Sequence, residues 1–237
     1  MVAPISLIPV HGVPEVHAGD VLATLFADAA DAQGTPIESG DCLVVTQKVV
    51  SKVEDRLVPI DPDDRAARRA LVEQESVRVL RRRGDLIISE TTHGFVCANA
   101  GIDLSNVEHG FAALLPLDSD KSAKRIRDAL RATRGVEVAV IVSDTFGRPW
   151  RNGLTDVCIG VSGLAAVVDL RGTEDALGRE LQVTEVAVAD EVAAAAELVM
   201  GKSAGVPVAI VRGLDASWFG EGSAKDLVRG PQDDLFR

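Results

Sequence analysis

The sequence predicts an α+β fold made of two lobes. Short β-branched runs such as Cys42–Thr46 and Val138–Val142 are typical of buried strands. They alternate irregularly with helical patterns of different lengths, which favours α+β over a regular doubly wound sheet. The 237 residues contain no internal repeat, low-complexity segment or long linker. The two lobes of the predicted domain 1–237 are therefore expected to be interleaved rather than joined in series.

In the first half, the expected elements follow from apolar spacing and from residues that begin or end helices. They are a strand at 5–10, a helix that Asp20 caps and that ends before Gly34, strands at 42–46 and 57–60, a helix from Asp61 to Arg83 that Gly84 stops, and a strand at 86–89. The last helix is rich in arginine. A solvated face that pairs with Asp and Glu is favoured over a binding patch for these side chains, which are Arg65, Arg68, Arg69, Arg78, Arg81, Arg82 and Arg83.

The same signals place the elements of the second half. They are a helix at 121–133 after the Asp118–Asp120 cap and before Gly135, the strand at 138–142, an apolar strand-and-turn segment at 155–168, a helix from Thr184 to Met200, a strand at 206–211 and a short helix at 223–228. Thr184 is expected to cap its helix and Gly201 to stop it.

Composition and charge limit the partners. The chain is 46% hydrophobic and 26% charged, as expected for a globular protein with a sizeable core. A net charge of −11 argues against a nucleic-acid or membrane surface, and 3% aromatic residues argue against base stacking. There is no signal-peptide pattern and no apolar stretch of about 20 residues, so a cytoplasmic protein is expected. Cys42, Cys97 and Cys158 are far apart and are expected to be buried, reduced thiols.

The segment from Val138 to Gly153 is the strongest candidate for a functional site. Its buried strand is expected to stop at Ser143–Thr145, which would place Asp144 at the carboxyl end of a strand, where ligands of α/β folds bind. Arg148 and Arg151 follow in the loop. Carboxylate oxygens suit a hard metal, and guanidinium groups suit phosphate. The alternative, in which Asp144 caps a turn and the arginines are solvated, is equally compatible with the pattern.

Two other segments carry weaker signals. If the chain turns helical after the strand at 42–46, Gln47, Ser51 and Lys52 would line one rim. The segment at 92–106 is rich in small residues, which let the backbone approach a ligand, and Asp103 and Asn106 lie three apart within it. A simple turn motif explains the second segment at least as well.

Several common motifs are absent or incomplete. Gly201-Lys202-Ser203 resembles the end of a P-loop, but position 196 is Ala and the tripeptide ends a helix instead of starting one. No Gly-x-Gly-x-x-Gly follows a strand, and there is no Gly-x-Ser-x-Gly nucleophile elbow. The four histidines have no metal-binding spacing.

Six ordered segments together resemble one family, the coenzyme F420-0:L-glutamate ligases. The segments are Leu7–Val10, Val44–Lys52, Cys97–Asn106, Ser143–Arg151, Asp169–Gly172 and Ala189–Gly201. The segments occur in the same order over nearly the whole chain, so the set identifies the family more specifically than any single segment does. The chain ends at Arg237, and the resemblance therefore implies a stand-alone ligase domain without a fused flavin-binding domain.

The resemblance implies a two-lobed α+β fold in an intertwined homodimer and a GTP-dependent amide ligase. Its partners would be GTP, L-glutamate and coenzyme F420-0. Two divalent cations, Mn²⁺ or Mg²⁺, are implied, with K⁺ as a further candidate cation. The reaction would proceed through an acyl phosphate, which gives the carboxylate a good leaving group, and would release GDP and phosphate. Later rounds would add γ-linked glutamates.

The resemblance also implies roles for particular residues. Asp103 and Asp144 would hold one metal, and Thr145 would belong to the second. Catalytic roles are implied for Asp144 and Lys52, and Arg148 is a candidate for the acidic substrates alongside Arg151 and Arg171. Family members often carry Gln or Glu where this chain has Lys202, and a protonated lysine cannot ligate a metal. The residues expected to contact GTP are Leu7, Ile8, Pro9, Val10, Gln47, Lys52, Asn106, Met200, Gly201, Lys202, Ser203, Ala204, Gly205, Val206 and Pro207.

Two other functions remain open at the level of sequence. One is a paralogous metal- and nucleotide-dependent ligase or phosphotransferase that acts on another carboxylate. The other is a nucleotide-binding regulatory module without turnover. Metal-dependent GDP release that requires both coenzyme F420-0 and glutamate separates the three.

Overall fold

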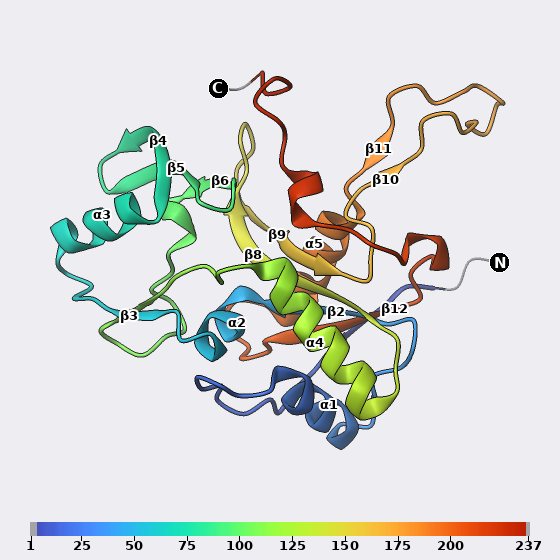
Figure 1. The fold of residues 1–237 in the computed structure, drawn as a ribbon, viewed down its shortest axis with the longest axis horizontal. Coiled ribbons are helices and arrows are strands. Elements are labelled where there is room, and N and C mark those ends of the chain that lie inside the picture. Colours follow the sequence, from blue (N-terminus) through green and yellow to red (C-terminus); the bar gives the residue numbers. More distant parts are fainter. Residues whose placement is uncertain (1–3, 236–237) are drawn as a thin grey trace.

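The larger lobe is built on a five-stranded mixed sheet (Figure 1). The computed structural model describes residues 4–235, so the first three and last two residues of the predicted domain lie outside it. The sheet order is β1 (Ser6–Pro9), β12 (Val208–Arg212), β2 (Cys42–Thr46), β8 (Ala139–Gly147) and β9 (Leu154–Ser162). Only the central pair β2 and β8 is parallel; the other neighbours are antiparallel. The predicted α+β class is confirmed.

Helices cover both faces of this sheet, which explains the continuous apolar runs in its central strands. Leu43 and Val140 face a core shared with α1 (Leu22–Ala32) and α4 (Ser119–Arg134). Their neighbours Val44 and Ile141 face a second core, shared with α5 (Val188–Met200). Successive side chains of a strand point to opposite faces, so a strand buried on both faces must be apolar at every position.

The smaller lobe is inserted between α2 (Gln47–Val53) and α4. It contains β3 (Leu57–Pro59), α3 (Arg65–Gln74), β4 (Ser76–Arg83), β5 (Leu86–Thr91), β6 (Val96–Ala98), the 3₁₀ turn η1 (Asn99–Gly101) and β7 (Phe111–Ala113). Strands β3 and β7 pair with each other where the chain leaves and re-enters the larger lobe. Val72, Ile87 and Ala100 form a small core of its own.

An arm and a tail complete the fold. Strands β10 (Val168–Asp169) and β11 (Glu185–Val186) pair and carry a long loop that projects from the larger lobe (Figure 1). The tail contains the 3₁₀ turns η2 (Ala216–Trp218) and η3 (Ala224–Leu227). Asp120 of α4 anchors the tail by accepting hydrogen bonds from Ser223 Oγ at 2.7 Å and the Ala224 N–H at 3.1 Å. Among residues 4–235, no helix is long and apolar enough to cross a membrane.

The long helix predicted from Asp61 to Arg83 is wrong. The helix α3 starts after its cap Asp64 and ends at Gln74, and the next residues form strand β4. Val77 and Val79 favour an extended chain, and the hairpin partner β5 supplies the backbone hydrogen bonds. Gly84, expected to stop a helix, instead lies in the β4–β5 turn at a φ of 60°.

Two predicted helix caps are also wrong, and one is confirmed. The Asp20 carboxylate accepts from the His17 N–H at 2.8 Å, and α1 begins after Val21 without a side-chain cap. Thr184 lies before β11, and α5 begins only at Val188. By contrast, Asp118 caps α4 through the Lys121 N–H at 3.1 Å. The three cysteines are buried free thiols, as predicted.

Candidate active site

An open cleft of about 370 Å³ lies where the loop after β1, helix α2 and the segment after α5 meet. This volume is in the range that binds cofactor-sized ligands. Three lysines and three acidic side chains line it among apolar residues. The lining residues are Val13, Pro14, Glu15, Val16, Thr46, Lys48, Val49, Lys52, Asn106, Asp156, Glu197, Met200, Gly201, Lys202, Gly205, Val206 and Pro207.

Strand β8 continues further than expected and brings its polar residues next to Asp156 of the cleft. The predicted stop at Ser143–Thr145 is wrong, because β8 pairs with β9 up to Gly147, with a register shift between Val142 and Ser143. Side chains alternate along a strand, so Ser143 and Thr145 point the same way. Both donate to Asp156 of β9, Ser143 Oγ to Oδ2 at 3.0 Å and Thr145 Oγ1 to Oδ1 at 2.6 Å.

Asp103 and Asp144 lie close enough to influence each other's titration. Burial is the main cause that raises the pKa of Asp144 to about 7; the Thr145 N–H and Lys48 oppose it, and the charges of Asp103 and Asp156 add to it. Burial alone would raise the pKa of Asp103 as well. However, Lys48 Nζ lies 2.7 Å from Asp103 Oδ2, and with the Ser105 N–H it holds the pKa of Asp103 below its usual value.

These two carboxylates fit one hard divalent cation. Asp144 is only 8% exposed and forms no ion pair with any residue from 4 to 235, so a cation would satisfy its charge. The described residues contain no cluster of three or more His, Cys, Asp or Glu side chains placed as metal ligands. Mg²⁺ sites are often completed by substrate phosphates around one or two carboxylates, and this donor set suits that pattern.

Helix α2 contributes Lys48, Val49 and Lys52 to the cleft and buries the side chains of Gln47 and Ser51. Lys52 lines the cleft and forms an ion pair with Glu15. The expectation that Gln47 and Ser51 line a rim is wrong, because both are fully buried. Ser51 Oγ donates to Gln47 Oε1 at 2.7 Å and to the Leu114 carbonyl at 2.6 Å. Gln47 Nε2 has no hydrogen-bond partner in the described part of the chain.

The segment after α5 closes the cleft and carries Lys202. Lys202 Nζ donates to Thr145 Oγ1 and lies 2.9 Å from Asp156 Oδ1 and 3.6 Å from Glu197 Oε1. Asn106 Nδ2 donates to the Lys202 carbonyl at 3.3 Å, which joins this segment to the loop that carries Asp103. Of the predicted segment Met200–Pro207, Ser203 and Ala204 are exposed and are not part of the walls.

Several predicted site residues lie elsewhere, and their roles stay predictions. In the segment Leu7–Val10, Leu7 and Ile8 pack against the two cores, and the cleft is lined by the loop that follows. Arg148 lies in the β8–β9 turn, where its Nη2 donates to the Asn152 carbonyl at 2.6 Å. Arg151 lies in the same turn, and Arg171 pairs with Asp169 at 2.7 Å on the arm.

Four charged residues of the cleft are not predicted from the sequence: Glu15, Lys48, Asp156 and Glu197. Asp156 had a detectable signal, because a carboxylate within an apolar strand is rarely buried without a partner. Lys48 lies four residues before Lys52, so a helix places both on the same face. Glu15 and Glu197 carry no comparable local signal, since they become part of the site only through the tertiary fold.

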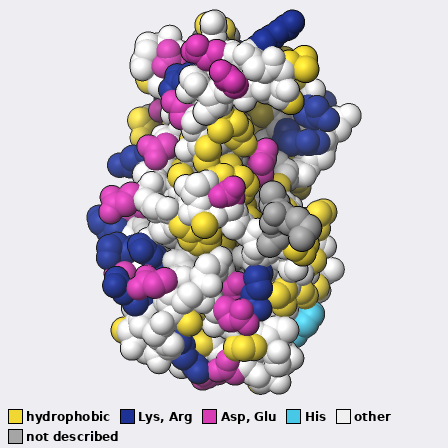
Figure 2. Space-filling model, turned by 90° about the vertical axis from the view of Figure 1, so that its right-hand side faces the viewer, with side chains coloured by type: hydrophobic (Ala, Val, Ile, Leu, Met, Phe, Trp, Pro, Cys, Tyr) yellow, Lys and Arg dark blue, Asp and Glu magenta, His cyan; other side chains and the backbone are white. Residues whose placement is uncertain are grey.

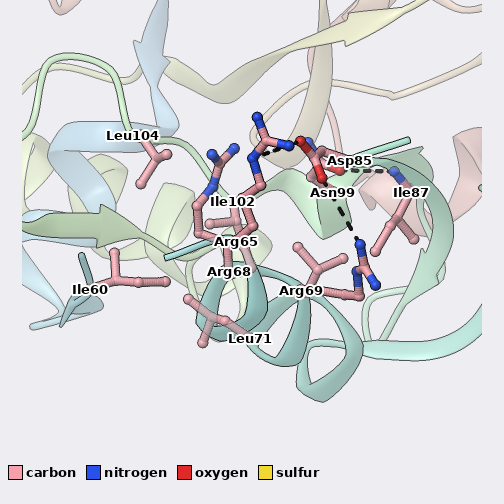
Figure 3. Close-up of a pocket in the computed structure, with 11 residues that line it drawn as sticks. Ile60, Arg65, Arg68, Arg69, Leu71, Asp85, Ile87, Asn99, Ile102 and Leu104 are labelled. Atoms are coloured by element: carbon pink, nitrogen blue, oxygen red, sulfur yellow. Dashed lines mark hydrogen bonds and ion pairs between the residues drawn. The ribbon is translucent and has the colours of Figure 1, made fainter. Parts of the chain in front are cut away.

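A second hollow lies in the smaller lobe, between α3 and the loop that contains Ile102 and Leu104 (Figure 3). Ile102 and Leu104 line it, whereas Asp103 between them reaches Lys48. Arg65 and Arg69 of α3 pair with Asp85 at 3.5 and 4.0 Å. These pairs, with those of Arg78 and Arg82 to Glu90 and Glu73, confirm the predicted solvated ion pairs for those arginines.

Comparisons with known proteins agree on one family. Residues 12–213 match the family described as F420-0:Gamma-glutamyl ligase. The chain is 45% identical to the coenzyme F420:L-glutamate ligase of Methanothermobacter thermautotrophicus, over 98% of this chain and 99% of the relative. It is 40% identical to the protein of that name from Methanocaldococcus jannaschii, over 85% and 86%. The Methanopyrus kandleri protein of that name is 41% identical over 94% of both chains. The chain therefore belongs to the F420-0:gamma-glutamyl ligase family.

Proposed function

We propose that this chain joins L-glutamate to coenzyme F420-0 at the expense of GTP. The observation that carries the proposal is a cleft lined by Lys48 and Lys52, where Lys48 lies 2.7 Å from the Asp103 carboxylate and both charges act on the buried Asp144, in a family that is named for this ligation. In a chain of net charge −11, the three lysines of the cleft offer ammonium groups that can contact a triphosphate directly.

The proposed reaction forms an amide in two transfers. The terminal carboxylate of the acceptor attacks the γ-phosphorus of GTP, and GDP leaves. The glutamate α-amine then attacks the acyl carbon, loses a proton, and inorganic phosphate leaves. Lys52, at the wall of the cleft, exchanges its Glu15 partner for a phosphate oxygen and offsets charge during the first transfer. No covalent intermediate on the enzyme is required.

A divalent cation, Mn²⁺ or Mg²⁺, would be held by Asp103 and Asp144, and when bound it would neutralise charge on the phosphates. Asp144 is fixed on β8 and Asp103 is fixed by its backbone bridge to Ala113, so both carboxylates are positioned before the ligand arrives. The predicted K⁺ stays a prediction.

The decisive experiment is a GDP-release assay with the purified chain and Mn²⁺. We expect GDP only when coenzyme F420-0 and L-glutamate are both present, and a product heavier by one glutamate residue in mass spectrometry. GDP release with a different carboxylate would favour the paralogous ligase. Tight GTP binding without turnover under any of these conditions would favour the regulatory module and refute the proposal.

A further inference from the structure

The Lys202 ammonium lies among oxygens from three elements. Its Nζ donates to Thr145 Oγ1 of β8 and lies 2.9 Å from Asp156 Oδ1 of β9. Glu197 Oε1, from the last turn of α5, lies 3.6 Å away. Thr145 and Asp156 are directly paired residues of the β8–β9 ladder, so the sheet holds both oxygens at a fixed spacing.

These oxygens are already committed, which leaves no room for a second divalent cation. Asp156 is only 4% exposed; its Oδ2 accepts from Ser143, and its Oδ1 accepts from Thr145 and Lys202. A cation on Thr145 and Asp156 would lie next to a protonated amine that cannot ligate it and that repels it. The oxygens at this position therefore do not fit the second metal that the family resemblance implies.

The proposed cation site at Asp103 and Asp144 differs from the oxygens around Lys202 in one respect. Lys48 occupies one oxygen of Asp103, but Asp144 is paired with no cationic side chain among residues 4–235. A buried carboxylate without a cationic partner still requires a positive charge. Asp156 has that charge from Lys202 of the same chain.

We propose that Lys202 replaces the second divalent cation, so that each active site binds a single one, at Asp103 and Asp144. This inference rests on the proposed function for its meaning in catalysis. Glu197 is beyond hydrogen-bond distance of Nζ, so one of the three N–H donors is available for a nucleotide phosphate oxygen. Lys202 thus acts as a catalytic residue that combines the roles of a cation and a phosphate ligand.

The test counts bound Mn²⁺ by equilibrium dialysis of the full chain against Mn²⁺ and a non-hydrolysable GTP analogue. We expect one Mn²⁺ per bound nucleotide in the wild type, two in Lys202→Gln and one in Lys202→Arg. Lys124→Gln, which changes an exposed lysine of α4, is the matched control and should keep one. Two Mn²⁺ in the wild type, none in the wild type, or one in Lys202→Gln would each overturn the proposal.

Electron paramagnetic resonance gives a second readout that does not depend on turnover. Two metal ions in one active site lie about 3.5–4 Å apart and couple magnetically. We expect an uncoupled Mn²⁺ spectrum for the wild type and a coupled one for Lys202→Gln, and the reverse assignment would contradict the proposal. Absence of ligase activity with coenzyme F420-0 would refute the proposed function, whereas the metal count would still decide the role of Lys202.

Discussion

Asp144 links the chemistry of the site to the stability of the fold. Burial raises its pKa to about 7, whereas an unfolded aspartate titrates near ~4. Between these pH values the folded state holds a proton that the unfolded state has released. The free energy of unfolding should therefore fall as pH rises from about 4 to 7, and at higher pH the full cost of the buried charge remains.

The corresponding prediction concerns Asp144→Asn in chelated samples. Removing the charge should make the protein more stable at pH 8, by a few kcal/mol at most, and should abolish the contribution of this residue to the pH dependence. Urea unfolding at pH 5 and pH 8 measures both effects. Activity and Mn²⁺ affinity should fall sharply in the same variant. Asp63→Asn, at an exposed aspartate, is the control, and equal stability of Asp144→Asn and wild type at pH 8 would contradict the interpretation.

A second prediction at this scale concerns Lys52. Its ammonium lies at the cleft wall with 14% of the side chain exposed and pairs with Glu15. Lys52→Ala should weaken GTP binding by roughly 1–3 kcal/mol, because a charge-assisted contact to phosphate is lost. Calorimetry measures this directly, with Lys124→Ala as the control on the exposed face of α4. An unchanged affinity for GTP would show that Lys52 pairs with Glu15 and does not contact the nucleotide.

At the scale of elements, α4 and β9 approach each other closely at Gly160. A Cβ atom at this position would lie 2.4 Å from the Ser119 carbonyl carbon at the start of α4. Gly160→Ala should therefore lower the free energy of unfolding by about 1–3 kcal/mol, because backbone must move to admit the methyl group. Gly220→Ala is the matched control, since nothing lies within 4 Å of its Cβ position. Equal melting temperatures for the two variants would show that the contact relaxes without cost.

Elements whose local signals agree with their tertiary surroundings were predictable from the sequence. Helix α4 has an Asp118 cap and a Gly135 stop, and β2 has a continuous β-branched run, so both were placed within two residues. The helix predicted over 61–83 is wrong in its second half, because arginine is tolerated in a helix and in an exposed strand alike. Pairing with β5 therefore determines that residues 76–83 form a strand. The contacts of Lys202 with Thr145 and Asp156 were not predictable, because they join residues 46 and 57 positions apart.

At the scale of the whole molecule, the β10–β11 arm carries apolar side chains that no other part of residues 4–235 covers. Leu177 and Val183 on its loop are 81% and 86% exposed, and the side of the molecule from which the arm projects shows further hydrophobic side chains between charged ones (Figure 2). Apolar side chains on a projecting arm are typical of a surface that another chain covers. The arm therefore supports the predicted homodimer as a proposal.

Light scattering tests this proposal. We expect the wild-type mass to be twice the 25.0 kDa of one chain, and the double variant Leu177→Asp, Val183→Asp to fall to that of one chain. Leu117→Asp, at an exposed leucine before α4, should keep the wild-type mass. A wild-type mass of 25.0 kDa would refute the homodimer, and an unchanged mass in the double variant would exclude the arm as its contact.

The position of β12 between β1 and β2 has a consequence for how the protein is made. Ser6 pairs with Arg212, and Val45 pairs with Val208, so the first strand joins the sheet only through the last one. Ribosomes deliver the chain from its N-terminus, and contacts between distant segments form slowly. A nascent chain released before residue 208 would already contain Asp103 and Asp144, yet it would lack the strand that joins β1 to β2 and that directly follows Val206 and Pro207 of the cleft. The proposed nucleotide binding would therefore have to wait for a strand that is made long after both carboxylates.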